Sequence, residues 1–300
     1  MIRKAIIPAA GYGTRFLPAS KAIPKELIPV VDKPTIQYVV EEAVAAGINE
    51  ILIIISRGKE AICSHFNPDP VLEDLLRRKG RESSLDTLKS LQEKAQIHFI
   101  YQEEMKGLGD AVLCARDFAG QETVAILLGD TILHHASPPS PLEGMMEVHR
   151  NRGGSVIAVR RVPRQRVSQY GVISGQPIDP RLTRIQGMVE KPKPEEAPSL
   201  LAVSARYLVT PQLFECLADT LPGVGGEIQI TDALDQLCRR EVVYGYEFDG
   251  TRLDIGNQLE YIKSNLMLGL HEPAMREALL QFMVEQVSIH GSANPATSEG

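Results

Sequence analysis

The sequence predicts an α/β fold of the doubly wound type, in which a mostly parallel, mixed sheet carries helices on both faces. Short apolar runs of strand length recur along the chain, and stretches of helical periodicity lie between them. The apolar runs are continuous, not alternating, which indicates strands covered on both faces. The chain has 300 residues, 43% of them hydrophobic and 23% charged, so it is long and apolar enough to bury the core that such a fold needs.

The first predicted elements form a βαβ unit. The run Ala5–Ile7 is the first strand and Ile51–Ile55 is the second. Between them, Thr35–Ala46 has apolar residues at helical spacing and stops at Gly47, a residue type that favours the end of a helix. Further strands are predicted at Ile97–Tyr101, Thr123–Leu128 and Ser155–Val159. Repetition of this unit places a ligand crevice beyond the carboxyl ends of the strands.

The rest of the chain predicts appendages to one main domain, which we place at residues 1–270. The stretch 69–95 is polar and helix-prone, which indicates a solvated helical face. Residues 156–206 are rich in short strands and turns, which indicates a smaller β-containing insertion. Residues 271–285 predict a C-terminal helix with a possible oligomer contact, and residues 286–300 lose the apolar period and predict a disordered tail.

The charge balance excludes general electrostatic attraction to nucleic acid or to an anionic membrane. Lys and Arg number 32 against 38 for Asp and Glu, a net charge of −6, so an anionic substrate must meet local basic groups. The cysteines show no metal-ligand spacing and predict buried, reduced thiols; they are Cys63, Cys114, Cys216 and Cys238. No stretch approaches the roughly 20 apolar residues of a membrane span, so we expect a soluble, cytoplasmic protein.

A glycine-containing loop follows the first strand directly. It reads AAGYGTR over residues 9–15, and Lys21 and Lys25 come soon after it. Glycines allow backbone N–H groups to approach phosphates, and Arg15 with the two lysines can neutralise a triphosphate. The spacing is neither a P-loop nor a dinucleotide fingerprint, and a Gly-x-Gly pair by itself indicates a tight strand-to-helix turn equally well. The neighbouring basic residues favour phosphate binding.

The segment GYGTRFLPASKAIPKELIPVVDKP, residues 11–34, resembles the signature of the sugar-1-phosphate nucleotidyltransferases. Residues 24–48 are similar, more narrowly, to the bacterial UTP-glucose-1-phosphate uridylyltransferases, also called UDP-glucose pyrophosphorylases. Further motifs follow in family order: Gln102 with KGLGDA at 106–111, LGD at 128–130, YGV at 170–172, VEKP at 189–192, ARY at 205–207, GEIQITDA at 226–233 and LDIG at 253–256. Any one of these motifs could arise by chance, but their ordered series could not.

The resemblance covers roughly residues 2–270 and implies a Rossmann-like fold of the nucleotide-diphospho-sugar transferase type. It implies Mg²⁺-dependent transfer of UMP from UTP to glucose 1-phosphate, which gives UDP-glucose and pyrophosphate. A sugar phosphate oxygen would attack the α-phosphorus in line, without a covalent enzyme intermediate. Positioning and charge neutralisation supply most of such catalysis, so no nucleophilic triad is needed. The family also implies a homo-oligomer, either a dimer or a tetramer.

The resemblance assigns the nucleotide and the reacting phosphates to named residues. The implied nucleotide-binding residues are Ala10, Gly11, Gly13, Thr14, Glu26, Gln102 and Gly107, the last two near the uracil edge. The implied catalytic residues are basic. Arg15 would hold the β- and γ-phosphates, and Lys25 would contact the phosphates at the reacting end, because Arg suits bidentate contacts and Lys suits a point charge. Lys191 would bind the phosphate of the sugar.

A pair of acidic residues is the implied metal site. Asp130 ends the apolar run VAILLGD, at the position where doubly wound folds bind ligands. The resemblance implies that Asp130 and Asp254 together hold Mg²⁺. For Asp254, a role in a turn or a helix cap would be the more common interpretation without the family match.

The implied sugar-binding residues are Gly171, Glu190 and Ala205. Glu190 and Lys191 are adjacent in a segment that we expect to be extended, so their side chains should point in different directions. A surface ion pair is the more common role for such a pair of neighbours. The family usually has Gly at Ala205, and we expect the added methyl group to crowd the sugar.

Other functions fit parts of the pattern. A thymidylyltransferase acting on dTTP would differ in the base pocket, but residues 24–48 favour the uridylyl branch. A regulatory homologue could bind nucleotide without catalysis, although such a module need not keep reacting-end charges such as Lys25 and Lys191. A dinucleotide-dependent oxidoreductase is disfavoured because Phe16 stands where the G-x-G-x-x-G fingerprint requires its third glycine.

Overall fold

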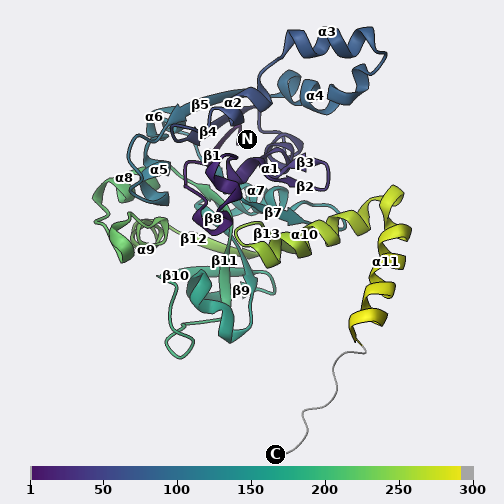
Figure 1. Cartoon of the computed structure of the whole chain (residues 1–300). Helices are drawn as coiled ribbons and strands as arrows, with labels where there is room; N and C mark the ends of the chain where they lie inside the picture. Colours follow the sequence, from purple (N-terminus) through teal and green to yellow (C-terminus); the bar gives the residue numbers. More distant parts are fainter. Residues whose placement is uncertain (1, 292–300) are drawn as a thin grey trace, which may run out of the picture.

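The computed structural model describes residues 2–291 (Figure 1). Its strands are β1 (Lys4–Pro8), β2 (Pro29–Val30), β3 (Lys33–Pro34), β4 (Glu50–Ile55), β5 (Gln96–Tyr101), β6 (Val124–Leu127), β7 (Thr131–His134), β8 (Ser155–Arg161), β9 (Gly171–Asp179), β10 (Leu182–Glu190), β11 (Leu201–Val209), β12 (Val243–Glu247) and β13 (Thr251–Asp254). Its α-helices are α1 (Thr35–Ala45), α2 (Ala61–Phe66), α3 (Pro70–Arg78), α4 (Asp86–Lys94), α5 (Leu108–Leu113), α6 (Arg116–Ala119), α7 (Pro141–Arg152), α8 (Gln212–Asp219), α9 (Ile230–Arg240), α10 (Gln258–His271) and α11 (Pro273–Gly291). The expected strands appear as β1, β4, β5, β6 and β8, and the expected first helix appears as α1.

Nine of the strands in residues 2–291 form one mixed sheet, in the order β5-β4-β1-β6-β11-β8-β12-β10-β9. The neighbours β5, β4, β1 and β6 run parallel, as do β8 and β12. Strand β11 is antiparallel to β6 and to β8, and β9 and β10 form an antiparallel hairpin. The mixed α/β fold is confirmed. The expectation of a mostly parallel sheet is wrong for the second half of the chain, because a tight hairpin can join antiparallel strands without a helical crossover.

Successive residues of the central strands face opposite sides of the sheet. Ile6 and Ile126 pack in a cluster with α5, α8 and α9, while Ile7 and Leu127 pack in a second cluster with α1 and α7. All four of these strand residues are fully buried. Apolar residues at consecutive strand positions therefore fill two cores at once, which explains the continuous apolar runs in the sequence.

The β-containing insertion expected at residues 156–206 corresponds to β8–β11. The β9–β10 hairpin extends the sheet at its far edge. A small apolar cluster of its own stabilises this region, formed by Val162, Val167, Val172 and Ala202. The insertion thus places Gly171 and Glu190, which pair across the hairpin, on the side of the sheet away from the first strands.

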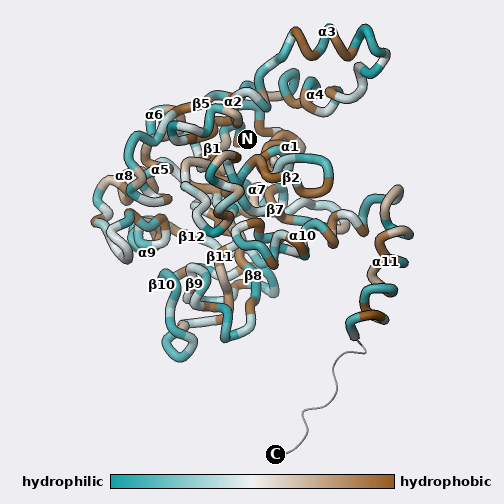
Figure 2. The backbone as a smooth tube through the Cα atoms, viewed as in Figure 1, coloured by the Kyte–Doolittle hydropathy of each residue, from teal (hydrophilic) through white to brown (hydrophobic). Residues whose placement is uncertain are grey.

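Two helical segments project from the body of the molecule (Figure 1). The α3–α4 pair has the solvated face expected at residues 69–95, since α3 has no buried residue and the Asp69 side chain caps its first turn. Figure 2 shows hydrophobic and hydrophilic residues alternating along α3 and α11. Helix α11 continues to Gly291, so residues 286–291 are helical where the sequence predicted a tail. The rest of that predicted tail, 292–300, lies outside the described residues.

The cysteines and the helix lengths bear on the remaining expectations. All four cysteines are free, but Cys216 is buried and Cys114 is exposed, so the expectation of buried thiols is wrong for Cys114. None of the helices in residues 2–291 is long and apolar enough to cross a bilayer.

Candidate active site

A cleft of about 600 Å³ opens at the carboxyl ends of the parallel strands β1 and β6. Most of the residues that the sequence singled out line it: Ala10, Gly11, Gly13, Thr14, Arg15, Lys25, Glu26, Gln102, Gly107, Asp130, Glu190 and Lys191. Gly171, Ala205 and Asp254 do not line it. The cleft lies where the topology predicts ligand binding, because the loops after parallel strands meet at one edge of the sheet.

The glycine-containing loop leaves β1 and turns into a short 3-10 helix at Thr14–Phe16. Gly13 has a φ of +65°, and a Cβ atom there would lie 3.1 Å from the side chain of Lys25. Both the backbone conformation and the close approach favour glycine. Arg15 projects from the 3-10 helix and is exposed. The loop therefore presents backbone and one free guanidinium group to the cleft.

Lys25 and Asp130 form an ion pair inside the cleft, with Nζ 2.5 Å from Oδ2. Burial disfavours the charged form of Asp130, but the Lys25 ammonium group and Arg252 outweigh it and lower the pKa of Asp130 to about 2. Burial likewise opposes the charge of Lys25, yet Asp130 and Glu26 raise the pKa of Lys25 above its usual value. Both groups are thus charged at neutral pH, which suits contacts with phosphate and metal.

Glu26 is buried below this pair, with 1% of its surface exposed. Both of its carboxylate oxygens accept hydrogen bonds from Lys59 Nζ, at 3.0 and 2.8 Å. Burial raises the pKa of Glu26 and lowers the pKa of Lys59, as expected for charges withdrawn from water. The sequence reasoning missed Lys59, which follows β4 in the stretch SRGKE without a recognisable motif. Its only signal is its position just beyond the carboxyl end of a central parallel strand.

Asp254 comes close to Asp130 through backbone pairing. Strands β7 and β13 form a two-stranded ribbon in which Asp254 faces Thr131, and the Ile255 N–H donates to the Asp130 carbonyl oxygen at 3.1 Å. The Asp254 carboxylate accepts hydrogen bonds from the Gly256 N–H at 2.7 Å and from Arg252 at 3.2 Å. Gly256 in turn lines the cleft. Asp254 therefore does not line the cleft itself but is bonded to Gly256, which does.

The far wall of the cleft is formed by two connected loops. The Gln102 side chain is buried and its amide nitrogen donates to the Gly107 carbonyl oxygen at 3.2 Å and to Asp110 at 2.7 Å. Gly107 has a φ of +106°, and a Cβ atom there would lie 2.8 Å from Glu227. The Gly109 N–H donates to the Ile228 carbonyl oxygen, which fixes the two loops together. These bonds hold Gln102 and Gly107 in place as one wall.

The sugar side of the predicted site is built on the β9–β10 hairpin. Glu190 accepts a hydrogen bond from Thr231 Oγ1 at 2.6 Å, and a Cβ atom on Gly171 would lie 3.2 Å from its carboxylate. Lys191 pairs with Glu190 at 3.2 Å, so these side chains do not point apart. The expectation failed because Lys191 has a φ of +45° and is not extended. Half of the Lys191 side chain remains exposed.

Ala205 lies within β11 and is buried outside the cleft. Its φ is +60°, in the left-handed region that favours glycine. This backbone conformation gives a reason for glycine at the position that does not involve the sugar, and the expected crowding of the sugar by the methyl group stays a prediction. The cost of the substitution falls on the backbone of β11.

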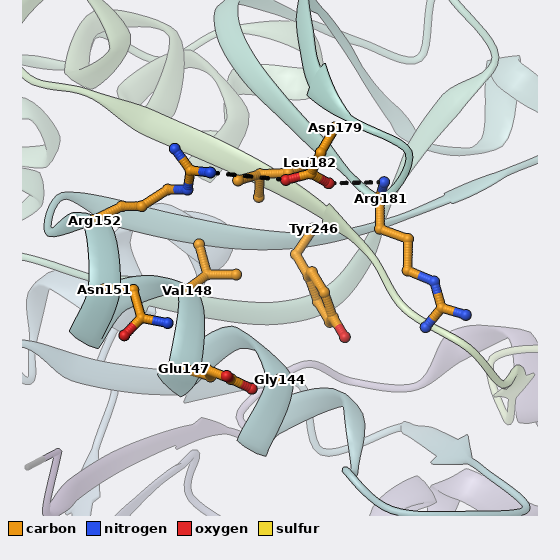
Figure 3. Close-up of a pocket in the computed structure, with 9 residues that line it drawn as sticks. All are labelled: Gly144, Glu147, Val148, Asn151, Arg152, Asp179, Arg181, Leu182 and Tyr246. Carbon is orange, nitrogen blue, oxygen red and sulfur yellow. Dashed lines mark hydrogen bonds and ion pairs between the residues drawn. The ribbon is translucent and has the colours of Figure 1, made fainter.

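A second hollow of about 240 Å³ lies between α7, the β9–β10 turn and β12 (Figure 3). Arg152 faces Asp179 there, while the guanidinium group of Arg181 points away (Figure 3). None of the residues that the sequence singled out lines this hollow. The chemistry that the sequence predicts is therefore gathered in the larger cleft.

Comparison with known proteins finds similar sequences and structures over most of the chain. A family described as nucleotidyl transferase matches residues 4–269. The UTP–glucose-1-phosphate uridylyltransferase of Bacillus subtilis is 45% identical over 282 residues, which cover 94% of this chain and 96% of that protein. The UTP-bound UGPase from Acinetobacter baumannii superposes with a TM-score of 0.87 at 36% identity, covering 95% of this chain and 99% of that one. A UDP-glucose pyrophosphorylase complexed with UDP-glucose gives a TM-score of 0.84 at 40% identity, covering 91% and 100%.

Proposed function

Because this chain belongs to the nucleotidyl transferase family, we propose that its cleft joins UTP and glucose 1-phosphate by direct attack of the sugar phosphate on the α-phosphorus. The chain is an enzyme that makes UDP-glucose from these substrates. The observation that carries the proposal is the placement of Arg15, Lys25 and Lys191 around one cleft that also holds Asp130. Both substrates are anionic, and the net charge of −6 makes such a local basic cluster necessary.

The nucleotide end of the cleft is the glycine-containing loop. Arg15 is exposed and has no ion-pair partner within residues 2–291, so its guanidinium group is free to take two phosphate oxygens at once. Lys25 already touches Asp130, and a triphosphate would give its ammonium group a second anionic partner. Gln102 and Gly107 stand at the wall where the base would lie.

The sugar end is the edge formed by Glu190 and Lys191. Thr231 orients the Glu190 carboxylate, which can then accept hydrogen bonds from sugar hydroxyls. The exposed Lys191 ammonium group is the cation available to the phosphate of the sugar. These contacts would hold the attacking oxygen in place, which is the main requirement for an in-line displacement without a covalent intermediate.

We infer that the carboxylates of Asp130 and Asp254 would hold a magnesium ion. Carboxylate oxygens are the ligands that Mg²⁺ prefers, and it commonly takes one or two of them together with substrate phosphates. Within residues 2–291, no group of three or more His, Cys, Asp or Glu side chains is placed to hold a metal ion by itself. Bound there, Mg²⁺ would neutralise charge on the reacting phosphates.

The test is pyrophosphate release with UTP, dTTP, ATP or GTP against glucose, galactose or N-acetylglucosamine 1-phosphate, with and without Mg²⁺. We expect turnover with UTP and glucose 1-phosphate that is lost when Mg²⁺ is chelated. Faster turnover with dTTP would move the base assignment to the thymidylyl branch. The absence of pyrophosphate release in every combination would refute the catalytic proposal and favour a regulatory homologue.

We also propose that a second copy of this chain covers part of α11. Within residues 2–291 this helix packs on α10, and Phe282, Val284 and Val287 are more than half exposed. Such an apolar surface on a projecting helix is typical of an interface. Light scattering should give at least a dimer, and V284E/V287E should lower the mass; a wild-type monomer would refute the interface.

The free thiols support the cytoplasmic location expected from the sequence.

A further inference from the structure

The turn after β4, residues 56–59, forms hydrogen bonds with the glycine-containing loop of residues 9–15. Lys59 Nζ donates to the carbonyl oxygens of Ala9 at 2.7 Å and Gly11 at 2.6 Å. Ser56 Oγ donates to the carbonyl oxygen of Ala10 at 2.8 Å. Three successive carbonyl groups of the loop are therefore bonded to this turn. We propose that Lys59 is a positioning residue for the nucleoside triphosphate, an inference that rests on the proposed function of the cleft.

The position of Lys59 is fixed by the cost of burying its charge. Its side chain is 9% exposed, and an ammonium group removed from water is stable only when its donors are satisfied. The two loop carbonyls and the Glu26 carboxylate satisfy them in one geometry. A shift of the loop would leave one of these donors without an acceptor. Lys59 thus couples the shape of the loop to a buried ion pair.

The direction of the carbonyl groups decides what the loop presents to the cleft. With the carbonyl oxygens of residues 9–11 turned toward β4, the N–H groups of Ala10 and Gly11 have no acceptor within residues 2–291 and remain available to a ligand. Successive backbone N–H groups of this kind form anion-binding concavities. Lys59 therefore favours the loop conformation that a triphosphate needs, although it does not line the cleft itself.

Lys59 also balances a charge that would oppose substrate. Glu26 lines the cleft next to Lys25 and interacts electrostatically with it. Without Lys59, the Glu26 carboxylate would attract the Lys25 ammonium group and repel the phosphates. The bonds of Lys59 to both carboxylate oxygens reduce that effect. Loop shape and charge balance both predict that loss of Lys59 weakens the binding of UTP more than that of glucose 1-phosphate.

The test compares Lys59→Met with Lys33→Met in the full chain. Lys33 is a half-buried lysine that pairs with Glu41 at 2.8 Å outside the cleft, so it controls for the loss of a paired charge. We expect Lys59→Met to raise the KM for UTP about tenfold or more, with the KM for glucose 1-phosphate within about twofold of wild type. Calorimetric titration with UTP, in the absence of sugar phosphate, should show the same loss of affinity. Lys33→Met should bind UTP as wild type does.

A second variant guards against misfolding. Lys59→Met combined with Glu26→Gln leaves no uncompensated buried charge, so it should fold while the loop still lacks its support. Because Glu26 itself lines the cleft, Glu26→Gln alone is the reference, and weaker UTP binding in the double variant than in Glu26→Gln supports the proposal. The same UTP affinity in the folded double variant as in Glu26→Gln, or an equal rise in both KM values in Lys59→Met, would overturn it. Failure of the wild-type enzyme to turn over any substrate pair would refute the proposed function instead.

Discussion

Loss of the buried arginine of β11 should destabilise the fold by an amount that the structure allows us to work out. Arg206 has no exposed side-chain surface, and it forms a forked ion pair with Glu42 of α1, whose side chain is 12% exposed. It also donates to the carbonyl oxygens of Thr131 at 2.8 Å and Ala205 at 3.0 Å. Arg206 thus ties α1, β7 and β11 together next to Asp130.

The variant Arg206→Met keeps much of the side-chain volume but leaves the Glu42 carboxylate without its cation. Breaking a buried ion pair from one side costs about 3–5 kcal/mol, because the remaining charge is still withdrawn from water. For a chain of 300 residues, this loss lowers Tm by roughly 5–10 °C. Glu42→Gln in the same background removes the unpaired carboxylate charge. The double variant should therefore lose less stability than the two single variants added together, by about 2 kcal/mol.

Urea titration followed by circular dichroism gives the free energy of unfolding of the wild type, the two single variants and the double variant. Lys33→Gln, which removes a half-exposed partner of Glu41, is the matched control and should change stability by less than about 1 kcal/mol. Additivity of the two single variants within about 0.5 kcal/mol would show that Arg206 and Glu42 do not interact, and would refute the reasoning.

Further predictions concern the site and the pH dependence of stability. Asp130→Asn and Asp254→Asn should each lower turnover at least about 100-fold with the fold intact by circular dichroism, because each removes the charge of a proposed metal ligand; wild-type rates would exclude that residue from the metal site. Lys191→Ala should chiefly raise the KM for glucose 1-phosphate, measured by initial rates, and a change confined to UTP would contradict its assignment. Burial, with His271 and His135 nearby, lowers the pKa of His134, so its contribution to stability is present above about pH 6.5 and lost as the pH falls through its folded pKa. Tm should therefore fall more steeply between pH 7 and pH 5 in the wild type than in His134→Gln, and equal slopes would argue against this role.

Strands with continuous apolar runs could be predicted from the sequence, because burial on both faces leaves an unmistakable pattern. The runs around Ile6, Ile53 and Ile126 show this directly, and each became a central strand. The short strand Thr131–His134 was missed because its four residues carry no such run and its partner lies at Thr251–Asp254, far along the chain. The pairing of remote short strands depends on the assembled fold, which local patterns do not contain.

The candidate site was predictable where residue type and chemistry coincide. The position of Lys25 in the cleft followed from its motif. The φ values of Lys191 and Ala205 did not, because a non-glycine residue gives no sign of a left-handed backbone. Lys59 was missed for a different reason. Its partners are backbone carbonyl groups, which every residue carries, and the carboxylate of Glu26, so no motif marks them.

Because β7 pairs with β13, Asp130 and Asp254 come together only after β13 has been synthesised. Asp130 is translated before the β8–β12 region, but the strand that carries Asp254 emerges only after that region has been made. A growing chain that ends before β13 therefore carries Asp130 without Asp254, the second of the two proposed metal ligands. The pairing of β13 with β7 brings the two proposed metal ligands together, so the proposed metal site depends on β13 and is not complete in the first folded strands.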